Sequence, residues 1–242
     1  MRTNNTMTAT DQALWYLENI DMNDIFCPNK MQTNMDSDAT HLKEFKKNDF
    51  IFMVDEASDK VFFIVSGRIK IGTYSEKGKE ITKAILGKGE VFGELSIINS
   101  TEGRRDFAQA METSQVCALS TDQMKMLMKN HSNLSLFFMK IIGSRVLEME
   151  KRLESMVFKD SRTRIVDYII ELVAKKGQRV GYEFVVRNFF THQEIANITA
   201  TSRQTVTTTL NELKNKDLIT FNRKRLLVRD LEKLKGEVAV HV

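Results

Sequence analysis

The first half of the chain alternates short apolar runs with turns that contain glycine. Residues 1–40 are polar and weakly patterned, and we assign this N-terminal segment no function. From Leu42 onward the apolar runs are rich in Val, Ile and Phe, which favour strands. Short strands separated by glycine predict an antiparallel roll or barrel over residues 41–130. The expected strands are Phe50–Val54, Val61–Ser66, Ile69–Thr73, Ile81–Leu86 and Val116–Leu119.

The apolar residues then take on helical spacing. A short helix rich in Met is expected over Thr121–Asn130, and the longest helical pattern lies within residues 131–158. In this longer helix, apolar residues alternate three and four positions apart, which is the a/d spacing of a coiled coil. The stripe predicts the seam of a parallel homodimer, and packing inside a monomer core is the alternative. The seam residues are Met139, Ile142, Val146, Met149, Leu153 and Met156.

Residues 159–242 predict a winged helix-turn-helix domain. A helix is expected over Arg162–Lys175, and a short strand over Phe184–Asn188. The stretch Thr191–Leu213 is typical of two short helices around a tight turn, with Ser202 as N-cap of the second. Two short apolar segments after it flank a basic turn and predict a hairpin, or wing. These segments are Leu218–Phe221 and Arg225–Arg229.

The second helix of this pair is expected to expose side chains suited to DNA. Its polar face can hydrogen-bond base edges or phosphates, and no acidic residue precedes Glu212. An ordinary helical hairpin with a polar outer face is the alternative. We expect Thr191 and Ser202 to cap helices and touch phosphate, and the wing tip to contact phosphate. The candidate DNA-binding residues are Thr191, Ser202, Arg203, Gln204, Thr207, Thr208, Arg223 and Lys224.

Charge is distributed unevenly along the 242 residues. Lys159–Val242 contains 16 Lys and Arg against 10 Asp and Glu, whereas the rest of the chain contains 20 against 22. The basic excess therefore coincides with the predicted DNA-binding part. No apolar run is long enough for a membrane span, and residues 1–12 lack the pattern of a signal peptide. We expect a cytoplasmic protein without a membrane partner.

Few residues suggest catalysis or metal binding. We find no nucleophile–base set, no metal-ligand spacing and no phosphate-binding loop of the nucleotide-hydrolase type, so neither an enzyme nor a metal site is expected. Cys27 and Cys117 are too few for a four-thiolate iron–sulfur cluster within one chain. Both are expected to be ordinary thiols, with Cys117 buried in a strand.

Three segments in this order resemble the cyclic AMP receptor protein / fumarate-nitrate regulator (CRP/FNR) family of bacterial transcription factors. They are FFIVSG at Phe62–Gly67, LGKGEVFGEL at Leu86–Leu95, and the helix-turn-helix at Thr191–Leu213. The resemblance covers about Leu42–Lys235. It implies an α+β protein with an N-terminal antiparallel β-roll (a jelly roll like that of cyclic nucleotide-binding domains), a long dimerisation helix and a C-terminal winged helix-turn-helix.

The same resemblance implies a homodimeric regulator that binds double-stranded DNA at a near-palindromic operator and works with RNA polymerase, as an activator. Arg203 is similar to a family residue that contacts guanine. Gln204 stands where other members often carry Glu, so the half-site should differ from theirs, because Gln pairs with adenine and Glu accepts from cytosine. Thr208 stands where some members have a second base-reading Arg.

The resemblance also implies an effector site in the β-roll, and a cyclic nucleotide is one candidate. Gly93, Glu94 and Leu95 match the family's phosphate- and ribose-binding turn, and Arg104, with Arg105 beside it, has the spacing of its phosphate-binding Arg. No proline lies nearby, no Ser or Thr follows this Arg, and Asp106 adds negative charge. Cyclic AMP is therefore not favoured, and no cofactor is assigned.

Two other functions stay open as alternatives. One is a cyclic-nucleotide-binding regulatory module without DNA function, against which the basic C-terminal part argues. The other is a haem-based gas-sensing regulator, for which His41 and His131 are the candidate ligands.

Overall fold

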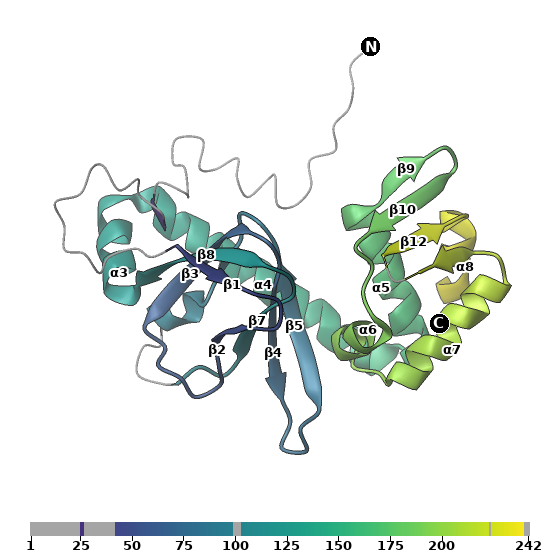
Figure 1. Cartoon of the computed structure of the whole chain (residues 1–242), viewed down its shortest axis with the longest axis horizontal. Coiled ribbons are helices and arrows are strands. Elements are labelled where there is room, and N and C mark those ends of the chain that lie inside the picture. The colour runs from purple at the N-terminus through teal and green to yellow at the C-terminus, as the bar shows by residue number, and fades with distance from the viewer. Residues whose placement is uncertain (1–24, 27–41, 99–102, 223, 240–242) are drawn as a thin grey trace, which may run out of the picture. The chain divides into compact units, whose positions relative to one another are not determined.

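The chain forms two compact units, Met1–Arg145 and Val146–Val242. The computed structural model describes residues 25–26, 42–98, 103–222 and 224–239, and Figure 1 shows their helices and strands. The expected antiparallel roll, long helix and winged helix-turn-helix are all present. Within the described residues, no helix combines the length and the apolar character that a bilayer span requires.

Two four-stranded antiparallel sheets make up most of the first unit. One has the strand order β1-β8-β3-β6 and the other the order β2-β7-β4-β5. The first sheet contains β1 (Lys43–Phe45), β8 (Ser114–Ser120), β3 (Lys60–Ser66) and β6 (Val91–Phe92). The second contains β2 (Phe50–Phe52), β7 (Phe107–Ala110), β4 (Ile69–Tyr74) and β5 (Glu80–Leu86).

Strand β3 is buried on both faces, because each face has its own core. Side chains of successive residues point to opposite faces of a sheet. Accordingly, Phe62 and Ile64 belong to the core shared by the two sheets, whereas Val61 and Phe63 belong to a second core. The continuous apolar run in β3 therefore reflects a central strand covered on both sides.

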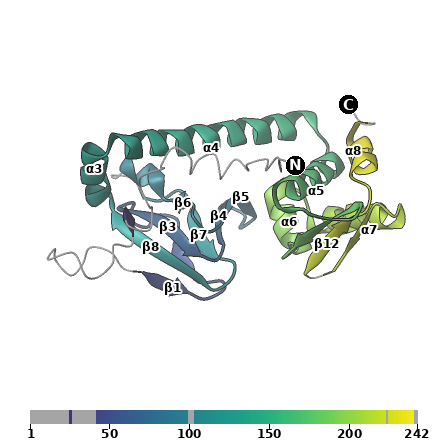
Figure 2. The same cartoon turned by 90° about the horizontal axis from the view of Figure 1, so that it is seen from above.

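Helices complete the second core. α3 (Thr121–Asn130) and the first turns of α4 (Ser132–Phe158) lie against β3 and β8 (Figure 2). Phe137 and Phe138 of α4 are buried there together with Phe26 from the N-terminal segment. Phe26 stacks on Phe63 with ring centroids 5.4 Å apart. Residues 1–40, treated above as a polar segment, thus contribute a core side chain.

The expected strands of the first unit are all present, with shifts of one or two residues at their ends. β2 stops at Phe52 rather than Val54, since Asp55 adopts a left-handed backbone conformation with φ of 67° and the chain turns there. β1, β6 and β7 were not predicted, and each has only two to four residues. The expectation that both cysteines are ordinary thiols is wrong for Cys117, which is buried in β8 and disulfide-bonded.

The second unit packs helices on a small antiparallel sheet. α5 (Ser161–Lys176) begins at Asp160, whose carboxylate accepts a hydrogen bond of 2.7 Å from the Thr163 N–H. The sheet has the strand order β11-β12-β10-β9 and contains β9 (Gln178–Val180), β10 (Glu183–Arg187), β11 (Ile219–Phe221) and β12 (Arg225–Val228). The predicted hairpin is therefore half of a four-stranded sheet. Neither β9 nor the last helix, α8 (Leu231–Ala239), was predicted.

Candidate DNA-binding and effector sites

The helix-turn-helix consists of α6 (His192–Thr199) and α7 (Arg203–Asn215). Thr191 caps α6, and its hydroxyl accepts from the Glu194 N–H at 3.2 Å while the Glu194 carboxylate accepts from the Thr191 N–H at 2.7 Å. Ala200 ends α6 in the left-handed conformation, with φ of 53°. Ser202 then caps α7 by accepting from the Thr205 N–H at 3.0 Å. The caps predicted for Thr191 and Ser202 are confirmed.

One face of α7 is exposed. Arg203, Gln204 and Thr208 are exposed, and in the part of the chain that the structure describes their side chains make no hydrogen bond. The opposite face packs inward through buried Val206, Leu210 and Leu213. The start of α7 thus presents a guanidinium, an amide and a hydroxyl group, while its buried face holds the helix in place. Guanidinium, amide and hydroxyl groups can hydrogen-bond base edges.

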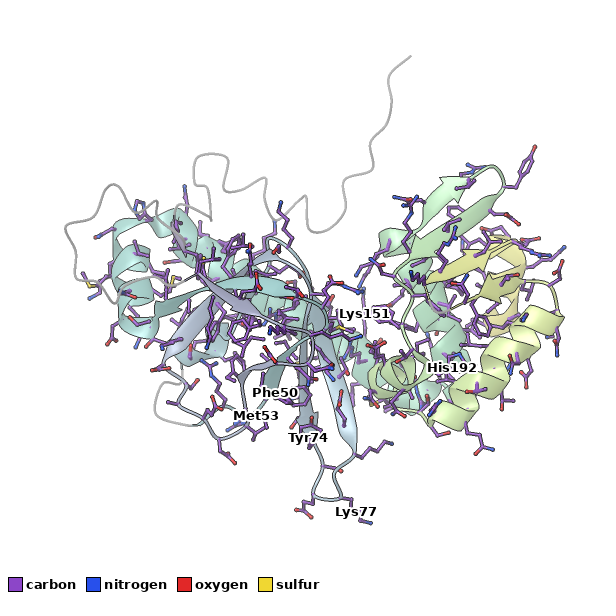
Figure 3. All side chains as sticks on the ribbon, viewed as in Figure 1. Phe50, Met53, Tyr74, Lys77, Lys151 and His192 are labelled. Carbon is purple, nitrogen blue, oxygen red and sulfur yellow. The ribbon has the colours of Figure 1, made fainter. Side chains whose placement is uncertain are left out.

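Thr207 differs from its neighbour Thr208. Its hydroxyl donates to the Arg203 carbonyl at 2.9 Å and also contacts His192 Nδ1 at 2.8 Å. Figure 3 labels His192, the first residue of α6. Burial lowers the pKa of His192, and the positive charge of Arg203 lowers it further. Sequence reasoning did not assign His192, because this contact joins residues on two different helices.

The wing is the hairpin of β11 and β12. The side chain of Asn222 shapes its turn by accepting from the N–H groups of Lys224 and Arg225, each at 2.9 Å. Lys224 is exposed at the tip, as a phosphate contact requires. Arg223, the other predicted contact, lies outside the described residues.

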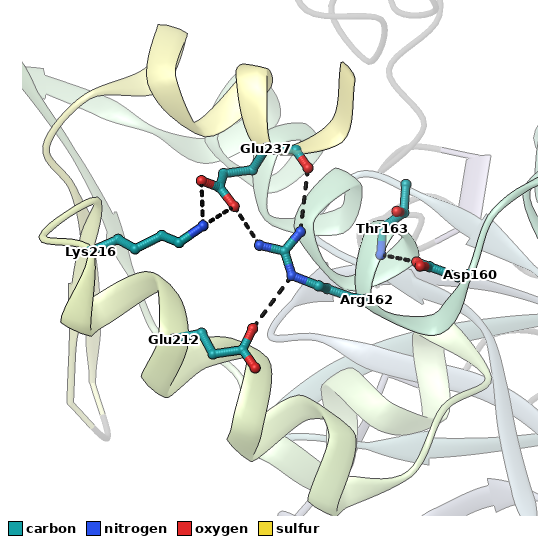
Figure 4. Close-up of polar contacts among 6 residues, drawn as sticks. All are labelled: Asp160, Arg162, Thr163, Glu212, Lys216 and Glu237. Carbon is teal, nitrogen blue, oxygen red and sulfur yellow. Dashed lines mark hydrogen bonds and ion pairs between the residues drawn. The ribbon is translucent and has the colours of Figure 1, made fainter. Parts of the chain in front are cut away.

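An ion-pair network joins α7 to the two helices beside it (Figure 4). Arg162 of α5 contacts Glu212 of α7 at 3.4 Å and forms an ion pair with Glu237 of α8. Lys216, just after α7, donates to both carboxylate oxygens of Glu237 at 2.8 Å. Burial alone would lower the pKa of Arg162, but its hydrogen bonds and charge interactions with the two glutamates raise it. The network fixes the far end of the predicted recognition helix.

The predicted effector turn is centred on a buried carboxylate. Gly93 is left-handed, with φ of 73°, and precedes the short 3₁₀ helix η1 (Glu94–Ile97). Glu94 is 2% exposed, and Arg145 of α4 forms an ion pair with its Oε1 atom. Arg145 also donates to the Val91 carbonyl at 2.7 Å. Glu94 Oε2 is buried and has no hydrogen-bond partner in the described residues, so one acceptor of the site remains open.

Arg104 lies directly over this turn. A Cβ atom on Gly93 would be 3.1 Å from Arg104 Nη1, so only glycine allows the approach without a shift. The guanidinium stacks 3.9 Å above the ring of Phe52 and donates to the Lys60 carbonyl at 2.8 Å. Burial lowers the pKa of Arg104, and nearby carboxylates, including that of Glu94, partly offset this effect.

The other predicted effector residues are more open. Arg105 and Leu95 are exposed, whereas Arg104 and Glu94 are buried. Asp106, whose charge would disfavour a phosphate, forms an ion pair with Lys83. The structure therefore brings Gly93, Glu94 and Arg104 together and adds Arg145, a residue 51 positions from Glu94 that sequence reasoning missed.

The predicted dimer seam is uncovered. Of its six apolar residues only Ile142 is half-buried, and Met149 of α4 is 70% exposed. A stripe that served the monomer core would be covered, so packing inside a monomer does not account for it. Of the two candidate haem ligands, His41 lies outside the described residues, and His131 is the exposed C-cap residue of α3.

Comparisons with known proteins match a domain in each half of the chain. Residues 42–131 match the cyclic nucleotide-binding domain, and residues 163–237 match the Crp-like helix-turn-helix domain. The chain is 27% identical over 188 residues to the global nitrogen regulator of Nostoc sp., an alignment that covers 77% of this chain and 84% of the relative. It is 25% identical over 191 residues to the CRP-like cAMP-activated global transcriptional regulator of Mycobacterium tuberculosis, covering 79% and 85%.

Among solved structures, that of a CooA variant from Carboxydothermus hydrogenoformans superposes with a TM-score of 0.72 at 25% identity, covering 82% of this chain and 88% of that chain. The helix-turn-helix match disfavours the alternative of a regulatory module without DNA function. With a nucleotide-binding roll followed by a DNA-binding helix-turn-helix, this chain belongs to the CRP/FNR family of transcription regulators.

Proposed function

We propose that the protein binds a near-palindromic operator as a homodimer and reads each half-site with α7. The exposed face of α7 carries this proposal. Arg203, Gln204 and Thr208 are exposed there and make no side-chain hydrogen bond within the described residues, and the Ser202 cap holds the start of the helix. Arg203 pairs with the O6 and N7 atoms of guanine, and Gln204 with adenine. Thr191, Ser202, Arg223 and Lys224 contact the phosphate backbone.

The second copy joins along α4. The exposed stripe from Met139 to Met156 supports this, since burying it against an identical helix removes large apolar side chains from water. Helix-turn-helix regulators of this family bind DNA as dimers. Residues 131–158 would then be the dimerisation helix between a sensor domain over residues 41–130 and a DNA-binding domain over residues 159–242.

The sensor domain takes its effector at Gly93, Glu94 and Arg104. The open acceptor on Glu94 Oε2 supports this assignment, because a ligand hydroxyl would satisfy it. Cyclic AMP is a candidate ligand, because residues 42–131 match the cyclic nucleotide-binding domain and these three residues have the spacing of its phosphate- and ribose-binding site. The pairing of Asp106 with Lys83 also removes one objection to an anionic ligand. Leu95 and Arg105 would border the site at its exposed side.

We infer that the protein acts in the cytoplasm, where chromosomal DNA lies. RNA polymerase is its proposed partner, and activation of transcription is the proposed outcome. This part of the proposal rests on family membership.

Selection of random duplex DNA by the purified full-length protein tests the function. The selection is run at moderate salt, with and without cyclic AMP. Enrichment of a two-fold symmetric motif without ligand indicates a dimer that binds DNA in its ligand-free form. A motif that needs cyclic AMP supports the effector assignment. Failure to enrich any motif under either condition contradicts the proposal.

A further inference from the structure

Three residues form a short hydrogen-bond chain between the two helices of the helix-turn-helix. The Thr207 hydroxyl lies 2.9 Å from the Arg203 carbonyl oxygen. His192 Nδ1 lies 2.8 Å from the same hydroxyl oxygen. A carbonyl oxygen only accepts and a hydroxyl has one proton, so both contacts are hydrogen bonds together only when Thr207 donates to this carbonyl. In that arrangement Nδ1 of His192 carries a proton and donates to Thr207.

This chain leaves Thr207 without a donor for DNA. A threonine hydroxyl has one O–H donor, and here α7 itself receives it. One of the two lone pairs accepts from His192. The side chain keeps one lone pair, which can accept from an adenine or cytosine amino group, and its methyl group, which can make apolar contact with a base. In the major groove the apolar partner is the C5-methyl group of thymine.

We propose that Thr207 reads a thymine methyl group in each half-site and that His192 is the positioning residue that holds Thr207 for this contact. The inference rests on the proposed DNA interface. It assigns different tasks to two neighbouring residues, because Thr208 is exposed and its hydroxyl makes no hydrogen bond to any residue that the structure describes. Thr208 is therefore suited to hydrogen bonding, whereas Thr207 is suited to methyl recognition.

The surroundings of His192 keep this contact insensitive to pH. Arg203 faces the ring from α7, and Phe221 of β11 packs edge-on with centroids 5.7 Å apart. Glu194, in the first turn of α6, is bound within its own capping box. Both the neutral Nδ1–H form and the cationic form of the imidazole donate from Nδ1. A change of charge on His192 therefore leaves its bond to Thr207 intact.

Deoxyuridine substitution tests the proposal, because it removes only the C5-methyl group of thymine. A duplex carrying the motif obtained by selection is resynthesised with each thymine replaced in turn, symmetrically in both half-sites. At one position we expect wild-type binding to weaken about fourfold per half-site, the effect of one buried methyl group. Thr207→Ser removes the protein methyl and should abolish this discrimination. Thr208→Ser, the matched control, should keep it.

His192 is tested with two variants. His192→Asn keeps an N–H donor close to the place of Nδ1 and should retain thymine discrimination, whereas His192→Ala should reduce it. Circular dichroism checks that both variants are folded, and DNA binding by the asparagine variant keeps the test informative if the alanine variant does not fold. A merely structural role for His192 would change overall affinity but leave the thymine-to-deoxyuridine ratio unchanged.

The outcomes separate this inference from the function on which it rests. If a symmetric motif is enriched but no thymine is sensitive to deoxyuridine, the DNA function stands and the inference is wrong. It is also wrong if Thr207→Ser keeps full discrimination, or if both His192 variants discriminate as wild type does. If no motif is enriched, the proposed function itself fails and the inference with it.

Discussion

At the scale of single residues, Arg203 carries most of the expected sequence preference. Its guanidinium is exposed on α7 and has no hydrogen bond within the described residues, so it is available to guanine. We predict that Arg203→Ala weakens binding by about 1–3 kcal/mol per half-site and removes the preference at one base pair. Competition against duplexes with single-base changes measures this. Lys233→Ala, which removes a positive charge from α8, should leave the preference intact, and equal effects of both variants would contradict the assignment.

Arg145 is a second residue with a testable role. Its partner Glu94 is almost fully buried, so removing the arginine leaves a core carboxylate without its ion-pair partner. We predict that Arg145→Ala destabilises the first unit by about 3–5 kcal/mol, measured by chemical denaturation. Glu148→Ala, on an exposed part of the same helix, is the control. A loss below about 1 kcal/mol, the value of a surface pair, would show that the ion pair has no such role.

At the scale of elements, α7 depends on helices on either side of it. Glu237 of α8 accepts from Lys216 and from Arg162, and these bonds lower its pKa despite partial burial. Because the pKa of Glu237 is lower in the folded state than in the unfolded state, its ionised carboxylate stabilises the fold at pH values above the unfolded-state pKa. This stabilisation is lost as the pH falls through the folded-state pKa. We therefore predict that amides in α7 and α8 lose protection against exchange, relative to their intrinsic rates at each pH, as the pH falls below the ordinary glutamate pKa of about 4.3.

Glu237→Gln separates this network from general acid effects. The variant should show faster exchange in α7 and α8 at neutral pH but a weaker further change on acidification, because its amide does not titrate. Hydrogen exchange followed by mass spectrometry resolves the two helices. An acid response in the variant equal to that of the wild type would rule out Glu237 as the titrating group.

The α4 stripe is also a property of an element rather than of one residue. Leu153 lies between Met149 and Met156 in the stripe, and its side chain is 64% exposed. We predict that Leu153→Glu converts the dimer to a monomer at micromolar concentration, because it places a charge in an apolar seam. Sedimentation velocity measures this. Lys151→Glu changes a charge two positions away, off the a/d stripe, and should leave the dimer intact (Figure 3). A monomeric wild type would contradict the seam itself.

At the scale of the whole molecule, the proposed dimer must read two half-sites at once. In such dimers the half-sites lie about one helical turn of DNA apart. We predict that inserting five base pairs between the half-sites turns one of them to the opposite face of the duplex and weakens binding more than any single mismatch. The same five base pairs placed outside the motif form the control. Unchanged affinity with the central insertion would indicate that each protomer binds independently.

Local signals were enough to locate most elements. The caps of α6 and α7, the turn between them and the strand pattern of β3 to β5 were all predicted, because capping and periodicity depend on residues a few positions apart. The same holds for Arg203, Gln204 and Thr208, whose exposure follows from the helical period of buried Val206 and Leu210. Very short strands such as β6 and β9 carry too few residues to show a period.

The sequence by itself determined the family, the order of the β-roll, long helix and winged helix-turn-helix, and which face of α7 is exposed. Only the tertiary structure decided which polar groups are already in use. The pairing of Arg145 with Glu94 and the bond between His192 and Thr207 each join residues from separate elements. Their physical basis is distance in space, to which spacing along the chain gives no guide. For the same reason, the burial of Phe26 and of Arg104 became evident only once the elements around them were packed.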